Sequence, residues 1–170
     1  MELRLSGVVN DSIVDGPGLR LTVFTQGCPH NCVGCHNPQT HDPQGGYAGD
    51  TDLILKALAD NPLLDGITLS GGEPFLQPEP CLHLAEGAKK LGLTVWAYTG
   101  YSWEDLIISK NPRLLAFLEQ IDVLIDGPFL IEERSLDLLF CGSKNQRLID
   151  VKKSLKANKL LLWEAETVWE

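Results

Sequence analysis

The sequence lacks several features that would point to common classes of partner. It has no surplus of positive charge, since 14 lysines and arginines stand against 23 aspartates and glutamates and the formal net charge is −9. Such a chain repels the phosphate backbone of nucleic acids. It also has no apolar run approaching about 18 residues, the length of a membrane-spanning helix, and no secretory signal pattern at its N-terminus. We therefore expect a cytoplasmic protein that binds neither nucleic acid nor membrane.

The size and composition are those of an ordinary globular protein. Hydrophobic residues make up 44% of the chain and charged residues 22%. A chain of 170 residues is long enough for one domain with a sizeable core, and a second independent domain would be cramped. We expect a single domain over residues 1–170.

Cysteine is scarce and unevenly placed. Three of the five cysteines are Cys28, Cys32 and Cys35, with three residues between the first pair and two between the second, whereas Cys81 and Cys141 stand far away. An odd number with a cluster fits metal binding in a reducing compartment better than a disulfide framework. The two isolated cysteines are expected to be small buried thiols.

The loop that carries the three clustered cysteines allows two kinds of metal site. Three thiolates on one short loop can hold three irons of a cubane iron–sulfur cluster and leave the fourth iron open to a substrate or cofactor. The alternative is a structural zinc site, in a protein that is not an enzyme, with His30, His36 or His41 as the fourth ligand. Zinc ligands usually come as two short pairs separated by a spacer, so this single loop favours the cluster.

Alternating strand and helix patterns predict an α/β fold. The expected strands are residues 19–25, 66–69, 93–98 and 123–125, with shorter ones at 146–151 and 159–163. The expected helices are residues 52–59, 80–91, 102–109 and 112–119. This alternation favours right-handed crossovers and mainly parallel strands. Because a complete eight-unit barrel needs about 250 residues, we expect a partial, open (β/α) barrel.

Two of the expected strands end at residues that suit a binding site. The first leads directly into the cysteine loop, and the second leads into the sequence SGGEP at residues 70–74. Loops at the C-terminal ends of parallel strands carry the chemistry of α/β folds. Glycines allow a ligand to approach the backbone, and Glu73 can accept hydrogen bonds from an ammonium group. An ordinary strand-to-helix turn explains the same residues equally well.

Together, the cysteine spacing and the glycine-rich strand end resemble the radical S-adenosylmethionine enzymes. In that superfamily the open iron is chelated by the amino and carboxylate groups of S-adenosylmethionine, and the glycine-rich strand end meets the amino group. The resemblance therefore implies a fold of the radical S-adenosylmethionine type and two cofactors. These are one [4Fe-4S] cluster, with Cys28, Cys32 and Cys35 as its metal ligands, and S-adenosylmethionine.

Further motifs resemble the subgroup that activates glycyl radical enzymes, in particular those acting on anaerobic ribonucleotide reductases. The motifs are DGPGLR at residues 15–20, CHN at 35–37, WAYTGY at 96–101, VLIDGPF at 123–129 and GSKNQR at 142–147. The resemblance covers about residues 7–151 and leaves 152–170 as a C-terminal extension. It implies an oxidoreductase that forms a glycyl radical on the large reductase subunit, with an electron donor such as flavodoxin or ferredoxin. Activators of the pyruvate formate-lyase type and enzymes like carboxydeazaguanine synthase share the first two motifs and remain alternatives.

The resemblance also implies which residues meet S-adenosylmethionine. Gly34 stands where many superfamily members carry an aromatic residue, so its backbone is expected to make the contact. His36 follows the third cysteine, where a contact with the cofactor and a supporting role are equally compatible with the sequence. Polar residues at strand ends can meet the ribose, the methionine or the partner, or can simply cap their turns. The predicted contacts are Gly34, Cys35, His36, Ser70, Gly71, Gly72, Glu73, Tyr98, Thr99 and Asp126.

Overall fold

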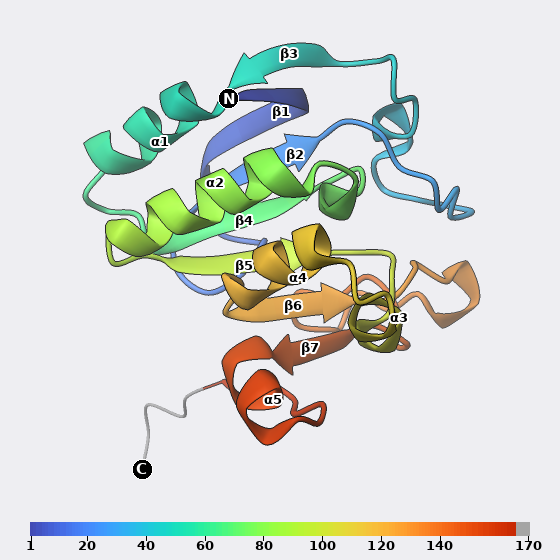
Figure 1. The fold of residues 1–170 in the computed structure, drawn as a ribbon. Helices are drawn as coiled ribbons and strands as arrows, with labels where there is room; N and C mark the ends of the chain where they lie inside the picture. Colours follow the sequence, from blue (N-terminus) through green and yellow to red (C-terminus); the bar gives the residue numbers. More distant parts are fainter. Residues whose placement is uncertain (166–170) are drawn as a thin grey trace.

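Residues 1–165 are described by a computed structural model, in which the strands form one open, seven-stranded sheet (Figure 1). The strands are β1 (Glu2–Ser12), β2 (Arg20–Thr25), β3 (Tyr47–Asp50), β4 (Gly66–Gly71), β5 (Thr94–Tyr98), β6 (Val123–Asp126) and β7 (Arg147–Asp150). Their order across the sheet is β3-β1-β2-β4-β5-β6-β7.

The four central strands β2, β4, β5 and β6 pair in parallel. At one edge β1 pairs antiparallel with both β2 and β3, and at the other edge β7 pairs antiparallel with β6. The two edge strands, β3 and β7, do not pair with each other, so the sheet does not close. The structure thus confirms the predicted α/β class and the open sheet with a parallel centre.

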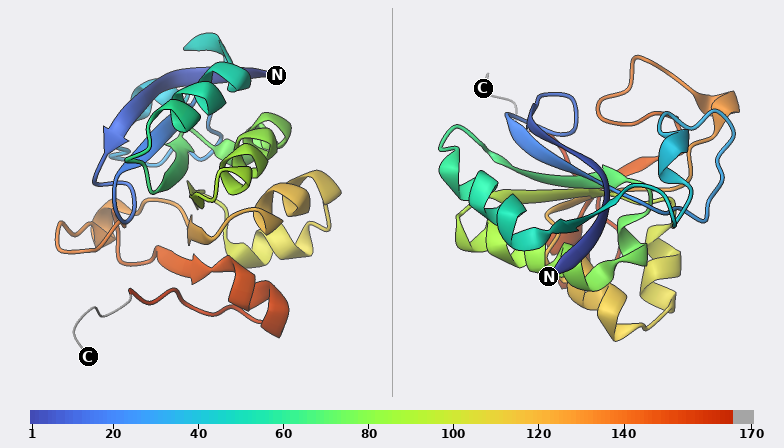
Figure 2. Two further views of the ribbon diagram at one scale, coloured as in Figure 1. Left: turned by 90° about the vertical axis from the view of Figure 1, so that its left-hand side faces the viewer. Right: turned by 90° about the horizontal axis from the view of Figure 1, so that it is seen from above.

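The helices gather on one face of this sheet (Figures 1 and 2). They are α1 (Thr51–Asp60), α2 (Pro78–Lys90), α3 (Trp103–Ile108), α4 (Pro112–Glu119) and α5 (Val151–Ala157). The first four fall where the sequence predicted helices, and polar side chains cap the starts of α1, α3 and α4. For example, Asp50 accepts from the Asp52 N–H and Ser102 accepts from the Asp105 N–H, which satisfies donors that the helix leaves unpaired.

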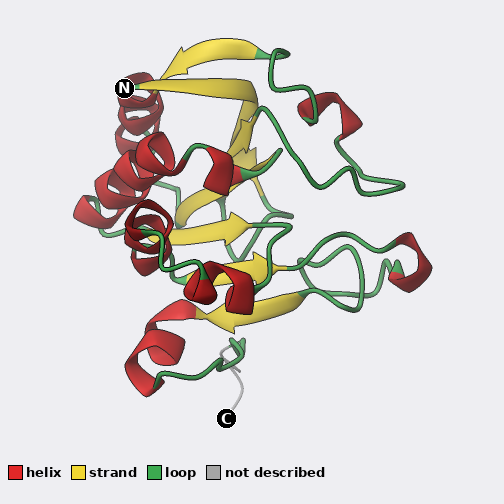
Figure 3. Ribbon diagram, turned by 45° about the vertical axis from the view of Figure 1, so that its right-hand side comes forward, coloured by secondary structure: helices red, strands yellow, loops and turns green. Residues whose placement is uncertain are grey.

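Alternate residues of the central strands belong to two different apolar clusters. Val95, Ala97 and Leu124 belong to the large core that lies under the helices. Trp96, between the first two, belongs to a second cluster on the opposite face, where its ring packs edge-on against Trp163 at a centroid distance of 4.9 Å. The opposite face is therefore covered by the C-terminal segment and by the long loop after β6, which projects beyond the strand ends (Figure 3).

Three parts of the chain differ from the expectation. The antiparallel strands β1 and β3 were not predicted, although Leu3 and Leu5 alternate with polar residues and both are buried. Residues 159–163 do not form the predicted strand, since they contribute a single bridge between Leu162 and Ile149. The expected C-terminal extension begins with α5, and its last residues, including Trp169, lie outside the described part of the chain.

No helix within residues 1–165 combines the length and the apolar character needed to cross a lipid bilayer.

Candidate functional site

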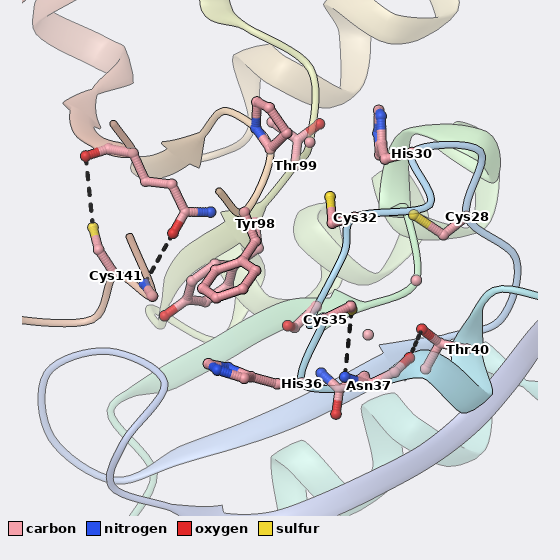
Figure 4. Close-up of a pocket in the computed structure, with 18 of the residues that line it drawn as sticks. Cys28, His30, Cys32, Cys35, His36, Asn37, Thr40, Tyr98, Thr99 and Cys141 are labelled. Carbon is pink, nitrogen blue, oxygen red and sulfur yellow. Dashed lines mark hydrogen bonds between the residues drawn. The ribbon is translucent and has the colours of Figure 1, made fainter. Parts of the chain in front are cut away.

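A cavity of about 370 Å³ lies at the C-terminal ends of the central strands. Its volume falls within the range of roughly 300–1,000 Å³ that is usual for small-molecule sites. The cysteine loop, the ends of β4 and β5, and the loop after β6 form its walls. Cys28, Cys32 and Cys35 stand on one side of this space, with Tyr98 and Cys141 across from them (Figure 4). The structure thus brings the three predicted metal ligands to one cavity.

The cysteine loop has little backbone structure of its own. It is held at its start, where Gly27 N–H donates to Thr40 O at 2.7 Å and Cys28 N–H donates to His41 O at 3.2 Å. Between Cys28 and Pro38 there is neither helix nor strand. The three thiols are free and partly exposed, so they are available to a metal.

The donor set fits an iron–sulfur cluster better than a zinc ion. Within residues 1–165, no three side chains of histidine, cysteine, aspartate or glutamate converge on one ion position. A four-iron cluster holds its three thiolates farther apart than a single ion does, because each thiolate binds a different iron. Burial raises the pKa of the Cys28 thiol to about 11, so this thiol is protonated at neutral pH and loses its proton when a metal binds.

The two glycines at the end of β4 let the strand lie against the base of the cysteine loop. Gly72 N–H donates to Thr25 O, and Glu73 N–H donates to Gly27 O, both at 2.8 Å. A Cβ atom on Gly72 would overlap the Gly27 carbonyl oxygen, and Gly71 adopts a φ of +94° that favours glycine. The SGGEP turn therefore joins two walls of the cavity, while Ser70, Gly71 and Gly72 also line it.

Glu73 is fully buried and ties together segments that are distant in sequence. Its carboxylate accepts from Phe75 N–H at 3.0 Å, from the Thr99 hydroxyl at 2.9 Å and from Gly100 N–H at 2.8 Å. A fourth contact, at 2.6 Å, joins it to Nε2 of His30 in the cysteine loop. The sequence alone indicates His30 only as a possible zinc ligand, because nothing in it shows which carboxylate the imidazole faces.

Seven of the ten predicted S-adenosylmethionine contacts line the cavity. They are Cys35, His36, Ser70, Gly71, Gly72, Tyr98 and Thr99. Gly34, Glu73 and Asp126 are not among its lining residues. Asp126 is 1% exposed and is engaged by Arg147 and by Trp103 N–H, and Gly34, at a φ of +75°, packs against the side chain of Ile131.

The loop after β6 forms the wall that faces the cysteines, and the GSKNQR motif fixes its shape. Gln146 Oε1 accepts from Gly142 N–H at 2.9 Å, and Gln146 Nε2 donates to Gly127 O at 3.1 Å. The Tyr98 hydroxyl donates to Phe140 O at 2.7 Å, and burial raises the pKa of this phenol. The sequence showed this motif but gave no sign that its glutamine closes the loop.

The DGPGLR motif holds the remaining wall through the buried side chain of Arg20. Its guanidinium donates to Pro17 O, to the Thr68 hydroxyl and to Thr94 O. No carboxylate of residues 1–165 bonds to it, and burial lowers the pKa of Arg20 to about 10. These contacts anchor the loop whose residue Asp15 lines the cavity.

Comparison with known proteins identifies the class to which this site belongs. A family profile described as "4Fe-4S single cluster domain" matches residues 14–149, a range that contains the cysteine loop and every wall of the cavity. The chain belongs to this family of iron–sulfur proteins.

Curated relatives narrow the class to one kind of protein. The anaerobic ribonucleoside-triphosphate reductase-activating protein of Escherichia coli K12 is 34% identical over 143 residues, which cover 79% of this chain and 90% of the relative. Proteins of the same name from Haemophilus influenzae and Enterobacteria phage T4 are 36% and 34% identical, and the matches cover 79% of this chain and 89% and 86% of theirs. The chain belongs to the family of anaerobic ribonucleoside-triphosphate reductase-activating proteins, which confirms the class of enzyme that the motifs predicted.

Among solved structures, QueE from Escherichia coli matches with a TM-score of 0.42 and 16% identity. The match covers 59% of this chain and 53% of that chain, and a likeness of this size carries no argument about function.

Proposed function

We propose that this chain cleaves S-adenosylmethionine reductively and generates a glycyl radical on an anaerobic ribonucleoside-triphosphate reductase. The observation that carries the proposal is the convergence of three free thiols and the glycine-rich end of β4 on one cavity, in a chain of the activating-protein family. A reduced [4Fe-4S] cluster, when bound, supplies the electron that splits S-adenosylmethionine into methionine and a 5′-deoxyadenosyl radical, which takes hydrogen from a backbone glycine of the partner.

In this proposal the residues of this chain bind the cluster and S-adenosylmethionine, orient them and shield them from solvent. Cys28, Cys32 and Cys35 hold one cluster and leave one iron free of protein ligands. The backbone at Ser70, Gly71 and Gly72, with the side chains of His36, Tyr98 and Thr99, forms the S-adenosylmethionine site, because these groups line the same cavity as the thiols. In this proposal Gly34, Glu73 and Asp126 stabilise the residues that line the site and do not contact S-adenosylmethionine themselves.

The substrate in this proposal is a loop of another protein, which needs a wide entrance. The unpaired edges β3 and β7 support an interpretation of the sheet as an open, partial barrel with lateral access to the cavity. Hydrogen-atom abstraction depends chiefly on the distance between the reacting atoms and on exclusion of solvent. The proposed chemistry therefore requires no acid–base triad at this site.

We propose as partners the large glycyl radical subunit of the reductase and a flavodoxin or ferredoxin as electron donor. The net charge of −9 disfavours nucleic acid as a partner. Five free cysteines suit the reducing cytoplasm, and we propose that compartment.

The test is anaerobic reconstitution with iron and sulfide, followed by dithionite and S-adenosylmethionine. We expect 5′-deoxyadenosine by mass spectrometry and, when the reductase is added, the electron paramagnetic resonance (EPR) doublet of a glycyl radical. Purification with one zinc and no iron would end the proposal. Formation of 5′-deoxyadenosine without a radical on the reductase, but with one on pyruvate formate-lyase, would reassign the partner.

A further inference from the structure

His30 makes a contact that neither cluster binding nor packing requires. It lies between Cys28 and Cys32, its side chain is 15% exposed, and its Nε2 is 2.6 Å from Oε2 of the fully buried Glu73. Among the hydrogen bonds of residues 1–165, this is the one that joins the stretch 29–34 to the ends of the parallel strands.

The direction of the hydrogen bond follows from the other partners of Glu73. Both carboxylate oxygens already accept from backbone N–H groups, of Phe75 and Gly100. A carboxylate in that setting acts as an acceptor, so the proton of the contact belongs to Nε2 of His30. The result is a charge-assisted hydrogen bond, which is shorter and stronger than a neutral one.

The neighbouring residues leave room for the imidazole and hold its plane. A Cβ atom on Gly100 would overlap three atoms of the His30 ring, so the glycine at this position permits the close approach. The Tyr101 ring packs edge-on against the imidazole at a centroid distance of 4.6 Å. Gly100 itself donates to Glu73, so one short segment after β5 both receives His30 and binds its acceptor.

We propose that His30 is a positioning residue, which fixes the cysteine loop against the ends of β4 and β5 so that the thiols and the S-adenosylmethionine site keep one mutual geometry. The inference rests on the proposed function and deepens it. His30 acts through Glu73, whose other acceptor contacts reach Thr99 and Gly100, two residues that line the cavity. Without the bond the loop stays attached at Gly27 and Cys28, but the stretch from Pro29 to Gly34 loses its link to the strand ends.

The variant that tests the proposal is His30→Leu, which keeps the approximate volume and removes the donor. Glu73 keeps three hydrogen-bond donors in this variant, so we expect the protein to fold. His30→Gln is the conservative variant, because its amide can donate to the same carboxylate. His83→Leu is the matched control, since His83 contacts the exposed Asp52 at 3.1 Å on the helical side of the sheet.

Each reconstituted protein is measured for iron and sulfide content, for S-adenosylmethionine affinity, and for the change that S-adenosylmethionine causes in the EPR spectrum of the reduced cluster. We expect full iron content in all of them. His30→Leu should bind S-adenosylmethionine about tenfold or more weakly, the loss expected for one charge-assisted hydrogen bond, and its spectral change should shrink. His30→Gln should recover most of both effects, and His83→Leu should match the wild type.

The experiment distinguishes failure of the positioning role of His30 from failure of the proposed function. If the wild-type spectrum does not respond to S-adenosylmethionine, the proposed function fails. If the wild type responds and His30→Leu keeps both its affinity within twofold and its spectral change, the positioning role is overturned and the function stands. Loss of iron from both His30 variants would also overturn it, because His30 would then serve cluster assembly.

Discussion

Arg147 and Asp126 form a two-point ion pair between the adjacent antiparallel strands β7 and β6. Arg147 Nε donates to Asp126 Oδ1 at 3.0 Å, and Nη2 donates to Oδ2 at 2.5 Å, while Asp126 is 1% exposed. Asp126 also accepts from Trp103 N–H, and Arg147 reaches Glu104. Hydrogen bonds to these two carboxylates raise the pKa of Arg147 further above its ordinary value. The pair therefore links β7 and the start of α3 to the end of β6, next to the cavity.

Removal of this arginine should destabilise the protein strongly. In Arg147→Met the Trp103 N–H is the one partner that residues 1–165 still give the buried Asp126 charge. We expect a loss of at least about 2 kcal/mol, somewhat below the roughly 3–5 kcal/mol of a fully buried pair, because Arg147 is partly exposed. Urea unfolding of the metal-free protein measures this loss in the free energy of unfolding. Arg113→Met, which breaks the exposed pair with Glu79, should cost less than about 1 kcal/mol, and similar losses in both variants would contradict the assignment.

The cysteine ligands can be separated from the other thiols one residue at a time. Cys28→Ala, Cys32→Ala and Cys35→Ala should each fail to keep a full [4Fe-4S] cluster after anaerobic reconstitution, because each thiolate binds its own iron. Cys141→Ala is the control, since this half-buried thiol lines the same cavity but faces the cysteine loop from the opposite wall. Iron and sulfide content and visible absorption give the readout. A full cluster in any of the first three, or its loss from Cys141→Ala, would refute the ligand set.

A methyl group at the glycine-rich turn should disturb the base of the cysteine loop. In Gly72→Ala the new Cβ overlaps the Gly27 carbonyl oxygen, which must move together with Cys28 beside it. Overpacking of this kind costs about 1–3 kcal/mol. Gly7→Ala places a methyl group in open space on β1 and should change stability by less than about 1 kcal/mol. Thermal unfolding compares the stability of the two variants. Equal stability would show that the turn can accommodate a methyl group without displacing Gly27.

The Cys141 thiol should react slowly in the folded protein. Burial, with a smaller contribution from the charge of Asp126, raises its pKa from 9.0 to about 11. The thiolate is the reactive form, so at pH 8 alkylation by iodoacetamide should be on the order of 100-fold slower in the folded than in the urea-unfolded chain. The folded rate should keep rising until the pH passes about 11. Peptide mass spectrometry resolves Cys141 from the other thiols, and equal rates at pH 8 would exclude the burial.

The sequence was informative where one local signal decides the structure. Residues 20–25 are rich in β-branched and aromatic side chains, residues 123–126 are mostly apolar, and both stretches end at glycine-containing loops and form buried strands. By contrast, β3 has no apolar pattern and contains Gly49, because the Leu5 side chain occupies the place of its Cβ and pairing with β1 supplies its hydrogen bonds. A partner 42 residues away in sequence, as Leu5 is for Tyr47, leaves no trace in a local pattern.

The residues of the site also divide into those that local sequence patterns predict and those that depend on contacts between distant segments. Cysteine spacing and strand-end position identified the ligands and most of the cavity lining, since both are local features. The role of Glu73 was not visible, because its acceptor sites are filled by donors from three separate segments. Arg147 likewise appeared in a motif, but only the pairing of β7 with β6 shows that it neutralises Asp126.

The cysteine loop is held by groups that arrive from distant parts of the chain. Thr40 and His41 fix its start, and Glu73, which also accepts from Gly100 N–H, binds His30 from a much larger sequence separation. Closing the intervening chain costs entropy, and paired strands of the sheet bridge similar separations, as between Phe24 and Ser70. The loop therefore takes its native shape only when the strand ends that hold it are also in place, and uptake of iron and sulfide reports on the completeness of folding in this protein.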